Sequence, residues 1–184
     1  MYRSLIIFLF CGITSALWSQ ENFHSDLVKK LSSDVHDLLF KKGVNHRERV
    51  FSTSEDTVIN YKLIRSNIIN KACNYIGVNY RYGQSSEKGF DCSGFVKFVF
   101  RNFGLELPHS SYTLYKISKH IETTNAQSGD LVFFVTRGKG VSHVGIYLGN
   151  NQFIHSPGKG RTVSIDSLNA YYYKRHLIGF GSVL

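Results

Sequence analysis

The sequence predicts an α+β fold, with helices in the first part of the chain and an antiparallel β-sheet in the second. Up to about residue 104, apolar residues recur at steps of three and four, which is the period of amphipathic helices. Beyond about residue 125, they come in short runs separated by Gly, Asn and Ser, which is typical of strands. Helices followed by strands indicate separate layers of structure rather than alternating strand–helix units.

Three helices and four strands are expected. Residues 22–41 carry an apolar stripe at helical spacing, and a second stripe covers about residues 60–76. A third helix is expected to begin at about Asp91 and to end near Gly104, because a glycine commonly follows the last turn of a helix. Four short apolar runs predict the strands, at residues 131–134, 144–148, 153–155 and 176–180.

The first 19 residues have the composition of a secretory signal peptide. Arg3 precedes an apolar run over residues 5–13, and small residues follow that run. Of the 184 residues, those that follow this segment are enough for one domain. We therefore expect a signal peptide at residues 1–19, a helical extension at residues 20–61 and one compact domain at residues 62–184.

The charge of the chain bears on its partners. With 22 Lys and Arg against 13 Asp and Glu, the formal net charge is +9, and +8 once Arg3 leaves with the signal peptide. This charge favours binding to anionic envelope surfaces. Export argues against nucleic acid, the other usual partner of a basic chain. No apolar run long enough to span a bilayer follows the signal peptide, so the protein is expected in the periplasm or outside the cell.

Cys92 lies at the start of the third predicted helix. Free backbone N–H groups and the helix dipole at that position stabilise a thiolate, so we expect a lowered pKa for the Cys92 thiol. The same N–H groups can bind an oxyanion. A cysteine there can also be a small buried apolar residue, which is the interpretation of Cys73 on the second helix. A disulfide between the two remains open in an oxidising compartment.

His143 and His155 are candidates for the base that a cysteine nucleophile needs and for the residue that orients that base. They lie on two predicted strands, with the turn at residues 149–151 between them. If all three turn residues form the loop, the histidines lie diagonally on one face, about 7–8 Å apart at their backbones. A loop of two residues would place them on opposite faces of the sheet.

Several motifs follow one another between residues 80 and 155. They are Tyr80-Arg81-Tyr82-Gly83, Asp91-Cys92-Ser93-Gly94-Phe95, Leu107-Pro108, the run from Gly129 to Phe134, the run from Ser142 to Leu148, and Phe153-Ile154-His155. In this order the chain resembles the NlpC/P60 family of papain-like cysteine peptidases over about residues 62–184. The resemblance implies a papain-like domain in which N-terminal helices pack on a central antiparallel sheet.

The resemblance also implies catalytic roles. Cys92 matches the nucleophile of the family and His143 matches the general base, which takes the thiol proton and later protonates the leaving amine. His155 matches the third polar residue, which orients the base. Members of the family hydrolyse amide bonds in peptidoglycan stem peptides, most often between γ-D-Glu and the diamino acid. A subgroup cleaves the cross-link between D-Ala and diaminopimelate. The chemistry needs no metal or other cofactor.

Three further residues are implied in the site, and two positions depart from the family. Tyr80 matches a tyrosine near the oxyanion. Asp91 and Ser93 flank the nucleophile, with helix capping and substrate contact as their expected roles. Gln84 stands where the family has a second glycine, and His109 stands where relatives often have arginine.

Other functions compete with the peptidase. Cys92, His143 and His155 could form a catalytic zinc site, which commonly has three protein ligands and a water. A non-catalytic protein that binds the cell wall could share the fold. An acyltransferase could use the same thioester, because water and other acceptors compete for an acyl-enzyme.

Overall fold

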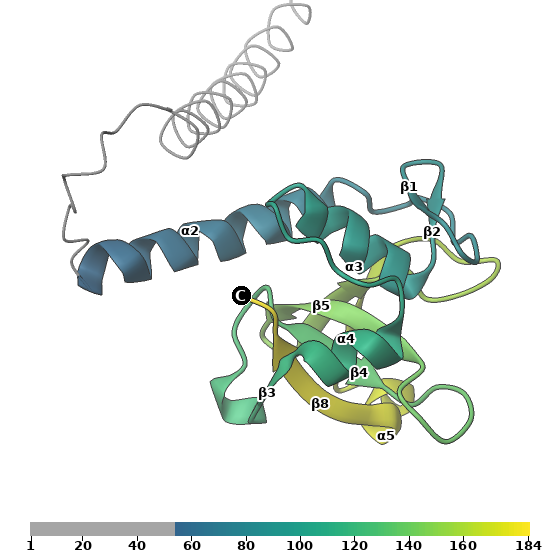
Figure 1. The fold of residues 1–184 in the computed structure, drawn as a ribbon. Coiled ribbons are helices and arrows are strands. Elements are labelled where there is room, and N and C mark those ends of the chain that lie inside the picture. The colour runs from purple at the N-terminus through teal and green to yellow at the C-terminus, as the bar shows by residue number, and fades with distance from the viewer. Residues whose placement is uncertain (1–53) are drawn as a thin grey trace, which may run out of the picture. The chain divides into compact units, whose positions relative to one another are not determined.

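The computed structural model describes residues 54–184 (Figure 1). The expected signal peptide, the helix expected at residues 22–41 and most of the expected extension at residues 20–61 lie outside the described residues. Within residues 54–184, no helix is both long and apolar enough to cross a membrane.

Six strands form one antiparallel sheet in the order β3-β8-β4-β5-β6-β7. The strands are β3 (Lys119–Ile121), β4 (Leu131–Phe134), β5 (His143–Gly149), β6 (Gln152–His155), β7 (Ser164–Ser167) and β8 (Leu177–Ser182). The four predicted strands correspond to β4, β5, β6 and β8. The sequence does not predict β3 and β7, because both are short, lie at the edges of the sheet and have no apolar alternation.

Within residues 54–184, four α-helices, one 3₁₀ turn and a short hairpin complete the fold. They are α2 (Ser54–Cys73), α3 (Cys92–Arg101), α4 (Ser111–Ile117), α5 (Tyr171–His176), the 3₁₀ turn η1 (Thr123–Asn125), and the hairpin of β1 (Ser85–Ser86) and β2 (Gly89–Phe90). The α+β prediction is therefore confirmed. The second predicted helix starts and ends earlier than expected, whereas the third begins as predicted and ends at Arg101. The short helices α4 and α5 were not predicted.

The sheet buries apolar side chains on both faces. Leu131 and Phe133 of β4 join the larger core, to which α3 contributes buried residues including Phe95 and Val99. Val132 and Phe134 point the other way, into a smaller cluster. Because neighbouring residues of a strand face opposite sides, burial on both faces explains why β4 is a continuous apolar run.

The hairpin of β5 and β6 has a two-residue turn. Asn150 and Asn151 have positive φ angles of 50° and 57°, as a tight hairpin turn requires, and Gly149 pairs with Gln152. The register then shifts between Tyr147 and Gly149, which places a bulge in β5. Beyond the bulge the pairing is the one that a three-residue loop would give. Of the two arrangements that the sequence leaves open, the structure thus has the histidines on one face. The opposite-face arrangement that a two-residue loop predicts is wrong here, because the bulge shifts the register.

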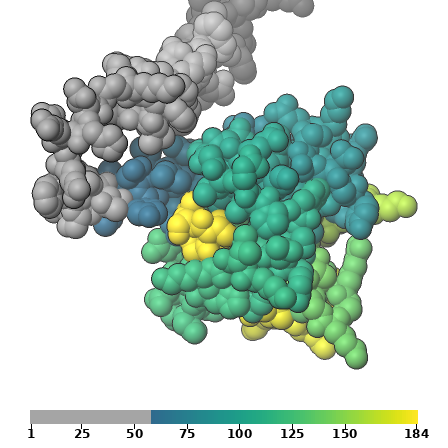
Figure 2. Space-filling model, in the orientation of Figure 1, coloured from purple at the N-terminus to yellow at the C-terminus, as the bar shows by residue number. Residues whose placement is uncertain are grey.

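Arg65 joins α2 to the sheet. Its Nη1 atom lies 2.8 Å from Oδ1 of Asp130, whose side chain is fully buried at the start of β4. It also donates to the carbonyl of Ser128 and to the hydroxyl of Ser182 at the end of β8. In Figure 2 the C-terminal residues lie at the surface beside α2, where this contact is made.

The Arg65→Met substitution tests this contact. It leaves the buried carboxylate of Asp130 without its charged partner, so the free energy of unfolding should fall by about 3 kcal/mol. Urea denaturation followed by circular dichroism measures the loss. Lys62→Met removes a positive charge from an exposed position of the same helix and should change stability by less than about 0.5 kcal/mol. Equal losses in the two variants would contradict a specific role for Arg65.

Candidate active site

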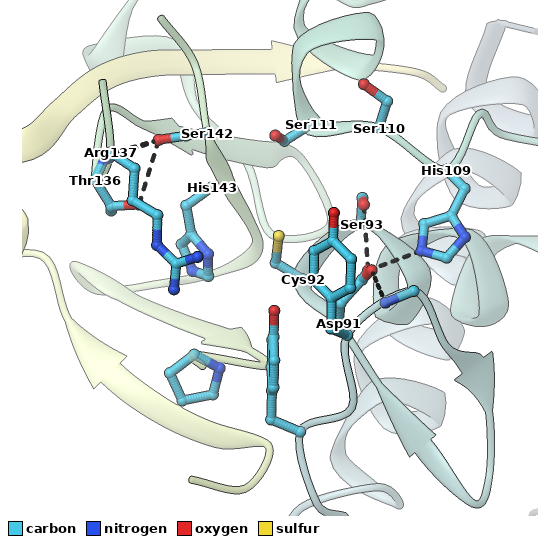
Figure 3. A pocket seen from close by; sticks show the side chains of 14 residues that line it. Asp91, Cys92, Ser93, His109, Ser110, Ser111, Thr136, Arg137, Ser142 and His143 are labelled. Atoms are coloured by element: carbon cyan, nitrogen blue, oxygen red, sulfur yellow. Dashed lines mark hydrogen bonds and ion pairs between the residues drawn. The ribbon is translucent and has the colours of Figure 1, made fainter. Parts of the chain in front are cut away.

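Cys92 is the first residue of α3, and Asp91 is the residue that caps the helix. The Asp91 side chain accepts a hydrogen bond from the backbone N–H of Gly94 at 2.7 Å. This cap fixes where the helix begins and turns the Cys92 thiol toward a cavity of about 390 Å³. Figure 3 shows Cys92 and His143 facing this cavity.

Steric contacts require glycine at position 94, within the motif from Asp91 to Phe95. A Cβ atom at Gly94 would collide with the backbone carbonyl of Gln84, and it would lie 2.8 Å from the ring of His109. Only glycine therefore allows the first turn of α3 to pack against the segment before β1. That packing positions the cysteine beside the cavity.

The two predicted histidines form a direct contact. His143 is the first residue of β5 and His155 is the last residue of β6, and both are buried. Nε2 of His143 lies 2.7 Å from Nδ1 of His155, which is hydrogen-bond distance. The hairpin therefore brings these two side chains together, which is one of the two arrangements that the sequence leaves open.

The structure adds two residues that the sequence analysis did not identify. Oδ2 of Asp166 lies 2.9 Å from Nε2 of His155, and it accepts a hydrogen bond of 2.9 Å from the hydroxyl of Tyr173. In the register of β6 and β7, His155 pairs with Ser164, so Asp166 is its diagonal neighbour on the same face. The side chains of three neighbouring strands thus form one continuous line of hydrogen bonds.

This line determines the tautomers of both histidines. The carboxylate of Asp166 can only accept, so Nε2 of His155 carries a proton. Nδ1 of His155 is then the acceptor, and Nε2 of His143 is the donor. The lone pair of His143 consequently lies on Nδ1, the ring nitrogen that is left free to act as a base.

Burial keeps both His143 and Cys92 uncharged. It lowers the pKa of His143 from 6.5 to about 3, with His155 contributing in the same direction. Burial and the neighbouring charge of Asp91 raise the pKa of the Cys92 thiol, against the effect of backbone hydrogen bonds. The expected lowering of the thiol pKa is therefore wrong, because desolvation outweighs the helix N-terminus. The resting pair is a neutral thiol and a neutral imidazole.

The carboxylate of Asp166 is the charged end of the line. Hydrogen bonding from His155 is the main reason that its pKa is lowered to about 2, and the hydroxyl of Tyr173 adds to the effect. Asp166 is therefore ionised at any pH near neutrality. No motif marks it in the sequence, because it lies in a short polar strand.

The three remaining predicted residues also line the cavity. Burial and then the neighbouring Cys92 raise the pKa of Tyr80, so its hydroxyl stays protonated and can donate. Ser93 donates to Asp91 at 3.3 Å, and His109 lies 2.8 Å from the same carboxylate oxygen. With Gly83 donating to the other oxygen, Asp91 has the expected capping role and also braces the wall of the cavity.

The arrangement does not suit a zinc site. Both ring nitrogens of His155 are engaged, one with His143 and one with Asp166, so His155 has no nitrogen free to bind a metal ion. Within residues 54–184, no three His, Cys, Asp or Glu side chains are placed to share a metal. Cys73 and Cys92 are both free thiols.

Known proteins match this chain in sequence and in fold. The sequence pattern described as the NlpC/P60 family matches residues 77–182. The murein DD-endopeptidase MepS/murein LD-carboxypeptidase of Escherichia coli K12 is 44% identical over 113 residues, which cover 61% of this chain and 59% of that protein. The probable endopeptidase p60 of Listeria monocytogenes is 41% identical over 116 residues, 63% of this chain and 23% of that protein.

The structural comparison agrees with the sequence comparison. The crystal structure of an NLP/P60 family protein from Staphylococcus aureus, described as similar to lipoprotein, has a TM-score of 0.59 and 35% identity. The match covers 65% of this chain and 41% of the Staphylococcus aureus protein. The chain thus spans less than two thirds of the length of these relatives. On the match to residues 77–182 and on the shared fold, the chain belongs to the NlpC/P60 family.

Proposed function

We propose that the protein is an exported cysteine endopeptidase that hydrolyses amide bonds in peptidoglycan stem peptides. The observation that carries the proposal is the line of hydrogen bonds from Asp166 through His155 to His143, which leaves one basic nitrogen beside the Cys92 thiol. Relatives that are 40–44% identical and are called murein endopeptidases support peptidoglycan as the substrate.

The proposed reaction begins with a proton transfer from the Cys92 sulfur to Nδ1 of His143. The sulfur attacks the scissile carbonyl carbon, a C–S bond forms and the carbonyl oxygen becomes an oxyanion. The C–N bond then breaks, and His143 gives its proton to the leaving amine. Water next gives a proton to His143 and attacks the thioester carbonyl. The C–S bond breaks, the acyl product leaves as a carboxylic acid, and His143 returns the proton to the sulfur.

The oxyanion needs hydrogen-bond donors at the mouth of the cavity. The proposed donors are the backbone N–H of Cys92, at the start of α3, and the hydroxyl of Tyr80, which lines the cavity. Both would stabilise the charge that develops in the transition state. His155 would hold the ring of His143, and Asp166 would balance the positive charge that His143 gains.

The bond that we favour is the cross-link between D-Ala and diaminopimelate. The family resemblance alone favours the γ-D-Glu bond. Two relatives, at 44% and 40% identity, are instead called murein DD-endopeptidases, a name for cleavage between two D-centres. That description fits the D-Ala–diaminopimelate cross-link.

Replacing the two cysteines tests the nucleophile. Cys92→Ala should abolish cleavage of cross-linked muropeptides, whereas Cys73→Ala should retain it, because Cys73 packs against the core from α2. Mass spectrometry of the products under reducing conditions measures cleavage and identifies the bond. Circular dichroism checks that both variants fold. Cleavage by folded Cys92→Ala would contradict the mechanism.

Replacing Asp166 tests the line of hydrogen bonds. In Asp166→Asn the amide can donate to His155 and favour the wrong tautomer, so kcat/KM should fall by at least about 10-fold. Tyr173→Phe removes one hydrogen bond to the same carboxylate and keeps its charge, so its loss should be smaller. NMR of the imidazole nitrogens reports the tautomer of His143 directly. An unchanged tautomer in Asp166→Asn would contradict the assigned role.

The pH dependence tests the neutral pair. Because the pKa of His143 is lowered from 6.5 to about 3, kcat/KM should persist below pH 6.5 and fall only as the pH approaches about 3. Burying this neutral ring also stabilises the fold above pH 6.5, and that stability is lost as the pH falls toward the folded-state pKa. Circular dichroism at each pH therefore limits the assay to folded protein. A loss of kcat/KM centred at pH 6.5 or above would contradict the neutral pair.

A further inference from the structure

Two residues that are charged at neutral pH line the cavity beside Cys92, one negative and one positive. Of the fourteen residues that line it, Asp91 carries the one carboxylate and Arg137 carries the one guanidinium or ammonium group. Asp91 immediately precedes α3, whereas Arg137 lies in the loop at residues 135–142 that joins β4 to β5. Figure 3 shows the two on opposite sides of Cys92, with Arg137 beside His143.

The two charges differ in what they bind within the protein. Both oxygens of Asp91 accept hydrogen bonds from its surroundings. The guanidinium of Arg137 has no hydrogen-bond or ion-pair partner within the described residues 54–184. Its backbone is nevertheless held, because the hydroxyl of Ser142 accepts from the N–H groups of Thr136 and Arg137, each at 2.9 Å. An exposed cation on a held backbone therefore faces the cavity without an anion from the described residues.

The position of Arg137 assigns it to one side of the scissile bond. In the proposed reaction His143 protonates the leaving amine, so the residue that carries this amine lies on the His143 side of Cys92. Arg137 lies on that side in Figure 3, and its charge contributes to the lowered pKa of His143. The guanidinium thus faces the leaving residue and not the acyl residue.

We infer that Arg137 binds a free carboxylate on the residue that carries the leaving amine, an inference that rests on the proposed function. A guanidinium and a carboxylate form two parallel hydrogen bonds, which are both strong and directional. In a D-Ala–diaminopimelate cross-link, the carbon next to the leaving nitrogen bears such a carboxylate. An amidated diaminopimelate or a lysine at this position has none.

Binding of a free carboxylate by Arg137 would also separate the two candidate bonds. When the γ-D-Glu–diaminopimelate bond is cut within a tetrapeptide, the carboxyl group next to the leaving nitrogen is already joined to D-Ala. It is then a neutral amide. Arg137 therefore favours the cross-link, and also a terminal residue with a free α-carboxylate, over the γ-D-Glu bond inside a longer stem.

Two matched substrates and two matched variants test the inference. The substrates are cross-linked muropeptide dimers whose leaving diaminopimelate has its carboxylate free or amidated. The wild-type protein should cleave the free form with a kcat/KM about 10- to 100-fold higher. Arg137→Gln should lose this preference, so that its kcat/KM values for the two dimers become equal. Lys139→Gln removes one charge from an exposed position of the same loop that does not line the cavity, and it should keep the preference.

The outcomes distinguish this inference from the proposed function. If the wild-type protein cleaves the two dimers equally, the subsite is overturned and the peptidase is not. The same holds if Arg137→Gln lowers kcat/KM for both dimers by the same factor. Titration calorimetry with Cys92→Ala measures the same preference as binding, and adding Arg137→Gln should abolish it. Binding with this preference but no wild-type cleavage would support the subsite and overturn the peptidase. Neither cleavage nor binding of either dimer would overturn both.

Discussion

The register of the β5–β6 hairpin is the constraint on which the site depends. A shift of one residue would turn His143 to the face opposite His155 and would separate the two rings. The two-residue turn at Asn150 and Asn151 would by itself give the wrong register, and the bulge in β5 corrects it. Gly145 is the second condition, since a Cβ there would lie 2.7 Å from the ring of Phe153 and 3.2 Å from Cβ of His155.

The same sheet then extends the site beyond the histidines. His143, His155 and Asp166 lie on three neighbouring strands, each displaced diagonally from the one before. Aromatic rings cover this line: Phe134 lies 5.8 Å from the ring of His143, and Tyr173 lies 5.4 Å from the ring of His155. The smaller apolar cluster therefore has two effects, because it stabilises one face of the sheet and also removes water from the histidine pair.

The part of this arrangement that could be predicted is the part encoded by local pattern. A helix start indicates Cys92 as a candidate, and two apolar strands with their connection indicate His143 and His155. Asp166 could not be identified in this way, because its strand is short and polar and its partner is set by the register across a long connection. The ionisation of Cys92 was predicted wrongly for a related reason. A helix start is visible in the sequence, whereas the burial that outweighs it depends on the whole fold.

The neutral resting pair gives Asp166 a specific importance in the proposed mechanism. Proton transfer from Cys92 to His143 creates two charges in a dry site, where isolated charges are costly. Binding of a substrate would offer the thiolate a carbonyl carbon and would move its charge to the oxyanion donors. The positive charge on His143 is stabilised through two hydrogen bonds, from His143 to His155 and from His155 to the ionised Asp166. Loss of that carboxylate would remove the only compensating anion on this side of the described site, so the charged state would rise in energy relative to the neutral one.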